Sequence, residues 1–215
     1  MRLYLSSFGL GDRPEEFAAL CGPAKRVAIV VNALDNRPRA RADWLKDQTD
    51  NLTSLGLVAF ELDLRDYFAA QGRLGEAMRR VDAVWASGGN TFILRRAMKQ
   101  SGFDALITTA VARDAIAYGG FSAGACIATP SLRGLEIVDD PNDVPAGYDP
   151  QIVWDGFGFV PFALAVHFKS DHPESHLIDR NIADYGRRRV PYRTLRDGEA
   201  LVIKGDRERL VGSPD

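Results

Sequence analysis

The chain has 215 residues, of which 46% are hydrophobic, and a formal net charge of -2 with a pI of about 6.0. This length and hydrophobic content predict a single domain over residues 1–215 with a sizeable core. The weakly acidic balance excludes proteins that rely on a basic surface to bind nucleic acid or an anionic membrane. Cys21 and Cys126 are too few for a disulfide framework, and no apolar run approaches a membrane span, so we expect a soluble protein of the reducing cytoplasm.

Strands and helices alternate through the first half of the chain. Apolar runs predict strands at 3–8, 27–31, 57–62 and 83–86, and the continuous runs are typical of strands covered on both faces. Helices are expected between these strands, and the clearest one follows them, with an apolar face made of Phe103, Leu106, Ile107, Ala110 and Val111. This alternation indicates parallel βαβ units with right-handed crossovers.

The pattern changes after Pro130. Residues 139–147 are rich in turn formers and predict a surface loop, 163–168 predict a strand, and 173–186 predict a helix that ends at Gly186. Two short apolar runs around Lys204-Gly205-Asp206 predict a β-hairpin. The fold class that we expect is α/β: a three-layer αβα sandwich around a mostly parallel sheet, closed by the C-terminal β-hairpin.

Residues 117–126 combine a short apolar strand, a turn dense in glycine and a run of small residues that would open a helix. Within them, Gly120-Phe121-Ser122-Ala123-Gly124 fits the nucleophile-elbow pattern, in which a serine lies on a sharp strand-to-helix turn. A helix that begins at Ala123 would aim free backbone N–H groups at negative charge forming beside Ser122. We therefore predict that Ser122 is a nucleophile, the alternative being a plain tight turn.

A second glycine turn, Ser87-Gly88-Gly89-Asn90-Thr91-Phe92, also leaves a buried strand and enters a helix, which Asn90 or Thr91 can cap. In an open parallel sheet the carboxyl ends of the strands share one rim, so this turn and Ser122 should lie together. Backbone N–H groups of Gly89 and Ala123 could then hold an oxyanion. The alternative is that these glycines only supply a positive φ.

A serine nucleophile needs a base, and the chain has three histidines, His167, His172 and His176. His167 is our candidate, because the strand predicted before it would carry it to the same rim as Ser122; otherwise it is a buried core histidine. The other two are expected to be surface or capping residues. A rival hypothesis is a metal site made by the three histidines with Asp171 or Glu174, although none of the usual short zinc motifs is present.

Four short motifs follow one another along the chain: Gly88-Gly89-Asn90-Thr91-Phe92, Gly120-Phe121-Ser122-Ala123-Gly124-Ala125, Ile137-Val138-Asp139 and Val166-His167-Phe168. Their order resembles the peptidase E family, the aspartyl dipeptidases and their relatives, including cyanophycinases. The resemblance implies a flavodoxin-like sheet similar to that of class I glutamine amidotransferases, with serine where those enzymes use cysteine. It also implies a serine-type dipeptidase that needs no cofactor and hydrolyses a small peptide or amide.

Residue by residue, the resemblance implies that Ser122 is the nucleophile, that His167 is the general base, and that the oxyanion donors are Gly89 and Ala123. It leaves the orienting acid open. The Ile-Val-Asp motif points to Asp139, whereas residues 197–202 are similar to the stretch that carries the acid in cyanophycinase-like members and favour Asp197.

Rigidity favours Asp197, because a carboxylate at the start of a strand is easier to hold than one in a turn-rich loop. We favour Asp197 as the acid that orients His167 and keep Asp139 as the alternative, with Asp140 and Glu136 as outside candidates.

The substrate is less defined. Aspartate-specific members of the family carry an arginine after the His-Phe motif, and here His176 falls about where that arginine would be. Neutral histidine lacks the bidentate fork of arginine, so a weak or broadened preference for an N-terminal aspartate is expected. Lys169, His176 and Asn90 are the candidate substrate contacts, and the long loop between Asp139 and Trp154 could roof the site.

Two other functions stay open at this point, a nonproteolytic amidase or esterase and a catalytically silent binding protein of the same fold. As for assembly, we expect a monomer or a homodimer.

Overall fold

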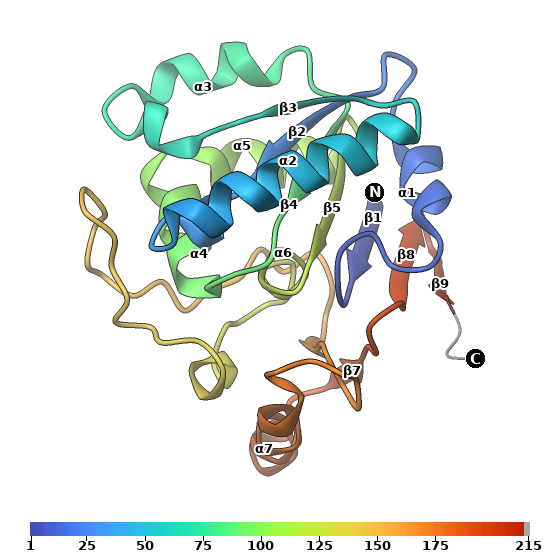
Figure 1. Cartoon of the computed structure of the whole chain (residues 1–215), viewed down its shortest axis with the longest axis vertical. Coiled ribbons are helices and arrows are strands. Elements are labelled where there is room, and N and C mark those ends of the chain that lie inside the picture. Colours follow the sequence, from blue (N-terminus) through green and yellow to red (C-terminus); the bar gives the residue numbers. More distant parts are fainter. Residues whose placement is uncertain (213–215) are drawn as a thin grey trace.

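The computed structural model of the protein describes residues 1–212, with a seven-stranded sheet at its centre (Figure 1). The strand order is β3-β2-β4-β5-β1-β8-β9. The strands are β1 (Arg2–Ser6), β2 (Arg26–Val30), β3 (Val58–Glu61), β4 (Ala83–Ala86), β5 (Ala117–Phe121), β8 (Ala200–Lys204) and β9 (Arg207–Val211). Strands β1 to β5 pair in parallel, and β8 and β9 form the expected antiparallel hairpin beside β1. The predicted α/β fold class is therefore confirmed.

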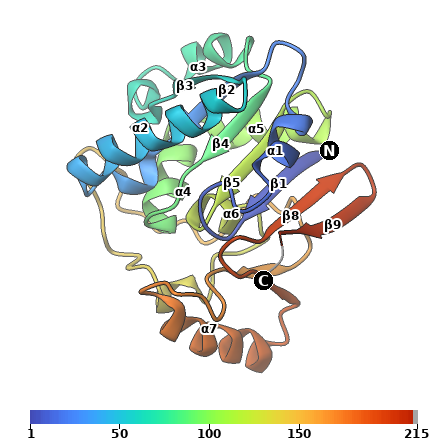
Figure 2. The ribbon, with the colours of Figure 1, turned by 45° about the vertical axis from the view of Figure 1, so that its right-hand side comes forward.

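Helices cover both faces of this sheet and give the expected three layers (Figure 2). Helices α1 (Pro14–Leu20) and α2 (Pro38–Ser54) pack on one face, where Tyr4 of β1 shares a core with Phe17 and Leu52. Helices α3 (Gln71–Met78), α4 (Thr91–Gln100) and α5 (Phe103–Ala112) pack on the other face, in the core that contains Leu3 and Leu5. Successive residues of β1 thus enter opposite cores, as the period of two in a strand requires.

The chain leaves the main sheet after the one-turn helix α6 (Ala123–Cys126) and the 3-10 turn η3 (Leu135–Ile137). It forms a separate parallel pair, β6 (Ala163–Ala165) and β7 (Tyr192–Thr194), joined by α7 (Ser175–Arg188). Figure 1 shows α7 and β7 below the sheet. This unit has its own small core, built on Ala163, Ala165, Ile178 and Tyr185.

Three predicted boundaries in this part are wrong, and one of them is the start of the helix expected from Pro173, which begins at Ser175. The strand expected over 163–168 ends at Ala165, because His167 and Lys169 have φ angles of 58° and 49°, which no strand accommodates. The helix expected to end at Gly186 continues to Arg188 and ends where Arg189 turns to a φ of 55°. No helix in residues 1–212 is long and apolar enough to cross a membrane.

Glycines allow α6 to pack directly on the ends of β4 and β5. A Cβ at Gly124 would lie 2.1 Å from the carbonyl oxygen of Ala86, and one at Gly120 would lie 2.7 Å from the carbonyl carbon of Gly124. The buried hydroxyl of Tyr118 donates a 2.6 Å hydrogen bond to the carbonyl of Gly124. The close approach fixes where the turn between β5 and α6 lies, and that turn holds Ser122.

We expect Gly124→Ala to lower the free energy of unfolding by about 1–3 kcal/mol or more, because the added methyl group meets backbone that cannot move aside. Gly186→Ala is the matched control, since nothing lies within 4 Å of a Cβ at that exposed helical position. That variant should gain about 0.5–1 kcal/mol from the higher helix propensity of alanine. Urea unfolding of the three proteins measures both changes, and equal stability of Gly124→Ala and the wild type would contradict this account.

Candidate active site

Ser122 lies on a sharp turn between β5 and α6 with φ 47° and ψ -115°. A non-glycine residue in this region is strained and persists only where its surroundings hold it. Here the backbone N–H of Ser122 donates to the carbonyls of Ser6 and Ser7 at 3.2 and 3.1 Å, and its carbonyl accepts from Cys126 at 2.9 Å. The strain at the predicted nucleophile is therefore maintained by β1 on one side and α6 on the other.

The imidazole of His167 connects Ser122 to Asp197. Its Nε2 lies 3.2 Å from Ser122 Oγ, and its Nδ1 lies 2.7 Å from Asp197 Oδ1. His167 is 1% exposed, so water has little access to compete for these contacts. Three of the predicted site residues thus form one continuous hydrogen-bonded chain, from residues far apart in the sequence.

Ser7 is a member of this site that the sequence analysis missed. Its hydroxyl donates to Asp197 Oδ1 at 2.8 Å and accepts from the backbone N–H of His167 at 2.8 Å. The only signal available was a pair of serines at the carboxyl end of an apolar strand, on the rim where ligands are expected.

The Asp197 carboxylate is held in its charged form. Burial alone would raise its pKa, but the hydrogen bonds from His167 and Ser7 outweigh burial and lower the pKa below its ordinary value. Its backbone is fixed as well, because Asp197 N–H donates to Ser170 Oγ at 2.8 Å. A charged, fixed carboxylate is what an imidazole needs to keep its Nδ1 proton in place.

Asp139, the rival acid, lies in the same pocket but makes other bonds. Its Oδ2 accepts the backbone N–H of Thr91 at 2.9 Å, at the start of α4. Burial raises its pKa to about 6, in spite of the hydrogen bonds from Thr91. Both ring nitrogens of His167 are already engaged by Ser122 and Asp197.

Within residues 1–212, the side chains of the two outside candidates bond only to backbone. The exposed Asp140 accepts from Asn142 N–H at 2.9 Å, and the exposed Glu136 accepts from Gly134 N–H at 2.6 Å.

The Gly88-Gly89 turn lies directly beside Ser122, as the shared rim predicted. A Cβ at Gly88 would lie 3.1 Å from the Cβ of Ser122. Gly89 has a φ of 129°, and a Cβ there would lie 2.6 Å from the carbonyl oxygen of Ala33. Asn90 caps α4, its side chain accepting from Phe92 N–H at 2.9 Å and donating to the Asp140 carbonyl at 2.9 Å. The polar atoms of Asn90 therefore serve the local structure.

A small pocket opens beside Ser122 and His167, between α4, α6, β6 and α7. Its polar lining residues besides Ser122 and His167 are Thr91, Cys126, Asp139, Glu174 and Asn181. The remaining walls are apolar and are made by Ala123, Leu135, Val138, Leu164, Val166 and Ile178. Lys169 and His176 are exposed and do not line it: Lys169 Nζ lies 5.2 Å from the ring centre of Phe168, and His176 Nδ1 lies 2.8 Å from the Pro173 carbonyl.

The long loop after Asp139 is tied down away from the pocket. Arg96 donates to the carbonyls of Pro141 and Pro150 at 2.7 and 3.1 Å, and the Tyr148 hydroxyl bonds to Asp35. Of this loop, only Asp139 lines the pocket. These bonds hold the loop against α4 and the 3-10 turn η1 (Asn32–Leu34).

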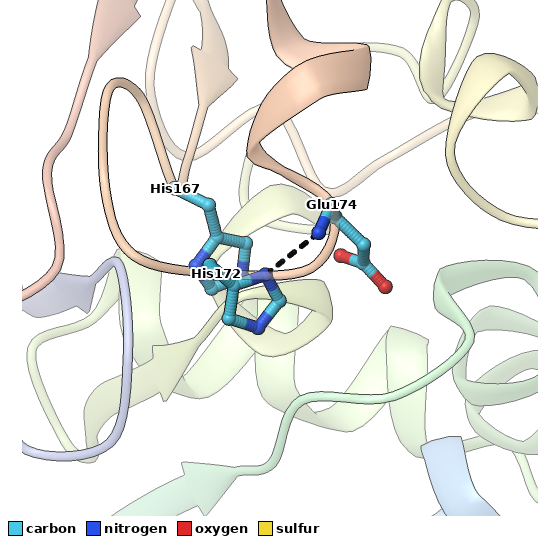
Figure 3. Close-up of side chains that lie close together, drawn as sticks. All are labelled: His167, His172 and Glu174. Atoms are coloured by element: carbon cyan, nitrogen blue, oxygen red, sulfur yellow. Dashed lines mark hydrogen bonds between the residues drawn. The ribbon is translucent and has the colours of Figure 1, made fainter.

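His172 stacks on the imidazole of His167, with ring centres 3.6 Å apart and planes within 4° (Figure 3). Burial, and then the neighbouring His167, lower the pKa of His172. The backbone N–H of Glu174 donates to its Nδ1 at 3.2 Å. The stack thus covers one face of the imidazole that contacts Ser122.

His167, His172 and Glu174 are the part of the predicted metal cluster that the fold brings together, with ligand atoms within 4.8 Å of one another. His176 and Asp171 are exposed and lie outside this group. Imidazole lone pairs lie in the plane of the ring, so two rings stacked face to face do not point at a common ion. The arrangement fits a hydrogen-bonded serine and histidine better than a zinc site.

Known proteins resemble this chain in sequence and in fold. The model of peptidase family S51 matches residues 14–211. An uncharacterized peptidase of Listeria monocytogenes is 28% identical over 154 residues, which cover 72% of this chain and 71% of that protein. A peptidase E of Streptomyces coelicolor is 34% identical over 148 residues, which cover 66% of this chain and 56% of that protein. The solved structure of a protein described as a peptidase E, from Listeria monocytogenes EGD-e, superposes with a TM-score of 0.79 at 23% identity, covering 99% of this chain and 98% of that one. The chain therefore belongs to peptidase family S51, the family of peptidase E, and is a serine-type hydrolase.

Proposed function

We propose that this protein is a dipeptidase-like exopeptidase that cleaves small peptides, with Ser122 as nucleophile, His167 as general base and Asp197 as the orienting acid. The observation that carries the proposal is the hydrogen-bonded chain from Ser122 Oγ through His167 to Asp197, with distances of 3.2 and 2.7 Å. The strained turn that presents Ser122 has the strand–turn–helix context of a nucleophile elbow.

The geometry supports acyl transfer in two steps. His167 Nε2 takes the hydroxyl proton of Ser122 as Oγ attacks the scissile carbonyl, and it then gives that proton to the leaving amine. Asp197 keeps the other proton on Nδ1 and stabilises the imidazolium that forms. Water, activated by the same Nε2, releases the acyl group from Ser122 and restores the free hydroxyl.

The oxyanion of each tetrahedral intermediate would lie between the Gly88-Gly89 turn and the start of α6. Backbone N–H groups of Gly89 and Ala123 are the donors that we assign to it. The support for this assignment is the contact between the two turns, which places Gly88 against Ser122. Since α6 is a single turn, individual N–H groups rather than a helix dipole carry the stabilisation.

Asp197 is favoured over Asp139 by its bonds and its charge. A carboxylate that orients a histidine must bond to it and remain ionised, and Asp197 meets both conditions. Asp139 bonds to Thr91, and its raised pKa reflects burial. We assign Asp139 to the wall of the substrate pocket.

Replacing Ser122 with alanine should abolish hydrolysis of a leucine dipeptide panel, by roughly 10³-fold or more in kcat, without unfolding the protein. Circular dichroism checks the fold, and Ser54→Ala, at an exposed position on α2, is the control that should keep its activity. A fully active Ser122→Ala enzyme would refute the serine mechanism. Cleavage of p-nitrophenyl esters or simple amides but of no dipeptide would instead indicate the nonproteolytic hydrolase.

Replacing Asp197 with asparagine should lower kcat on the order of 10²–10⁴-fold, because the amide favours the wrong tautomer of His167. Asp139→Asn should lower kcat far less, since Asp139 does not bond to the imidazole. Both variants are measured on the same dipeptide, with folding checked by circular dichroism. The reverse order of the two effects would assign the role to Asp139.

Asp139 should also make the protein less stable as the pH rises. Its pKa is about 6 in the folded protein against an ordinary 3.8, so the folded state holds this proton more tightly than the unfolded chain does. The stabilisation from that proton is complete below about pH 4 and is lost as the pH rises through about 6. Asp139→Asn should therefore match the wild type near pH 4 and exceed its unfolding free energy by about 1–3 kcal/mol near pH 8.

Urea unfolding at several pH values tests this expectation. Asp140→Asn, at the exposed neighbouring position, is the control and should follow the wild type at every pH. Equal stabilities of Asp139→Asn and the wild type near pH 8 would show that the buried carboxylate has no such cost.

A further inference from the structure

The imidazole of His167 makes its two hydrogen bonds through the ring nitrogens, in the plane of the ring. Nδ1 lies 2.7 Å from Asp197 Oδ1, and Nε2 lies 3.2 Å from Ser122 Oγ. These bonds fix the ring along its plane and resist tilting less, because the outer torsion of a histidine side chain is broad. Rotation about that torsion would move both nitrogens away from their partners. The base therefore needs a further contact that fixes the plane of its ring.

His172 makes a contact of this kind. Its ring lies flat on the imidazole of His167, with ring centres 3.6 Å apart and planes within 4° (Figure 3). At this separation the facing atoms are already in van der Waals contact, so tilting either ring alone would drive its edge into the other. His172 does not line the pocket beside Ser122. Its contact is thus with the base.

The ring of His172 is itself held from two directions. Its Nδ1 accepts the backbone N–H of Glu174 at 3.2 Å, just before α7 (Figure 3). On another side lies Phe8, which follows β1; its ring centre is 5.7 Å from that of His172 and 6.1 Å from that of His167. The His172 carbonyl also accepts from Ser175 N–H at 3.0 Å. The stack is therefore anchored both at α7 and at the carboxyl end of β1.

The same contacts favour a neutral ring at His172. A ring nitrogen that accepts an N–H bond carries no proton, so the proton of His172 is assigned to Nε2. Burial and His167 lower the pKa of His172, although Glu174 and Asp197 act in the opposite direction. His167 becomes an imidazolium in the proposed reaction. The face of a neutral aromatic ring accommodates that charge, whereas a second imidazolium 3.6 Å away would oppose it.

We propose that His172 is a positioning residue for the general base: its neutral ring, flat on His167, holds the imidazole in the plane that joins Ser122 to Asp197. It acts through His167 and contacts neither the substrate nor the reacting atoms. The inference rests on the proposed serine mechanism and adds a residue to it. Stacking is the property that matters, and the bond from Glu174 N–H serves to hold the stacked ring.

Two substitutions at His172 separate the stack from that bond. His172→Phe keeps a flat ring and loses the acceptor, whereas His172→Ser loses the ring and keeps an oxygen that can accept the N–H two residues on. We expect His172→Ser to lower kcat on a dipeptide by roughly tenfold to hundredfold with KM unchanged, the effect of a misplaced base. His172→Phe should keep kcat near the wild-type value.

The opposite pattern, an active His172→Ser and an impaired His172→Phe, would show that only the local bond matters and would overturn the proposal. Equal losses in the two variants would overturn it as well, because His172→Phe retains a stacked ring. Asp179→Asn, at an exposed position on α7, is the control and should leave kcat and KM unchanged. Circular dichroism and urea unfolding check the fold of each variant.

A spectroscopic measurement separates a failure of this inference from a failure of the proposed function. Long-range 1H–15N correlation spectra show which ring nitrogen of a histidine carries the proton, and the chain has three histidines to assign. In the wild type and His172→Phe, we expect His167 to hold its proton on Nδ1. In His172→Ser, we expect a mixture of the two tautomers.

That difference supports the positioning role even if no dipeptide is hydrolysed. The same single tautomer of His167 in all three proteins refutes it, even if the wild type cleaves dipeptides rapidly. A spectrum of the wild type in which Nδ1 of His172 carries the proton would also contradict the proposal, because the ring could not then accept from Glu174 N–H.

Discussion

The carboxyl end of β1 is the constraint on which the site depends. Carbonyls of Ser6 and Ser7 hold the backbone N–H of Ser122, and the Ser7 hydroxyl bonds to both His167 N–H and the Asp197 carboxylate. One short segment therefore positions all three members of the hydrogen-bonded chain. It can do so because β1 lies inside the sheet, between β5, which leads into Ser122, and β8, which follows Asp197.

Backbone strain occurs at two of the residues to which we assign the chemistry, as well as at four others within residues 1–212. Ser122 and His167 both have a positive φ, although neither is glycine. Each such conformation costs on the order of 1–3 kcal/mol and needs surroundings that over-determine it. At Ser122 these are the bonds to β1 and the close packing of α6 on β4 that glycine permits. At His167 they are the bonds to Ser7, Ser122 and Asp197.

The unit formed by β6, α7 and β7 completes the pocket from outside the main sheet. It has its own core, yet it supplies His167 immediately after β6 and Glu174 and Asn181 from α7. The main sheet supplies Ser122 and the glycine turn. The groups to which we assign the chemistry thus lie at the junction of the two parts, while the carboxylates and the amide that line the pocket come from the smaller unit and the loops before it.

Local patterns in the sequence determined the order and type of most helices and strands. They also singled out Ser122 and His167 as candidate site residues. Hydrophobic periodicity encodes which residues face a core, and glycine on either side of Ser122 encodes a turn that only small residues permit. The resemblance to peptidase E proteins offered two acids, and rigidity favoured Asp197.

Tertiary structure decided what no local pattern encodes. It places β1 between β5 and β8, so that Ser7 reaches His167 and Asp197. It also directs the carboxylate of Asp139 to the backbone of Thr91 and not to the imidazole. It also placed Lys169 and His176 on the surface, because the turn at 167–169 and the start of α7 direct them away from the pocket. Strand order and loop direction depend on contacts between distant residues, and these arise only when the whole chain packs.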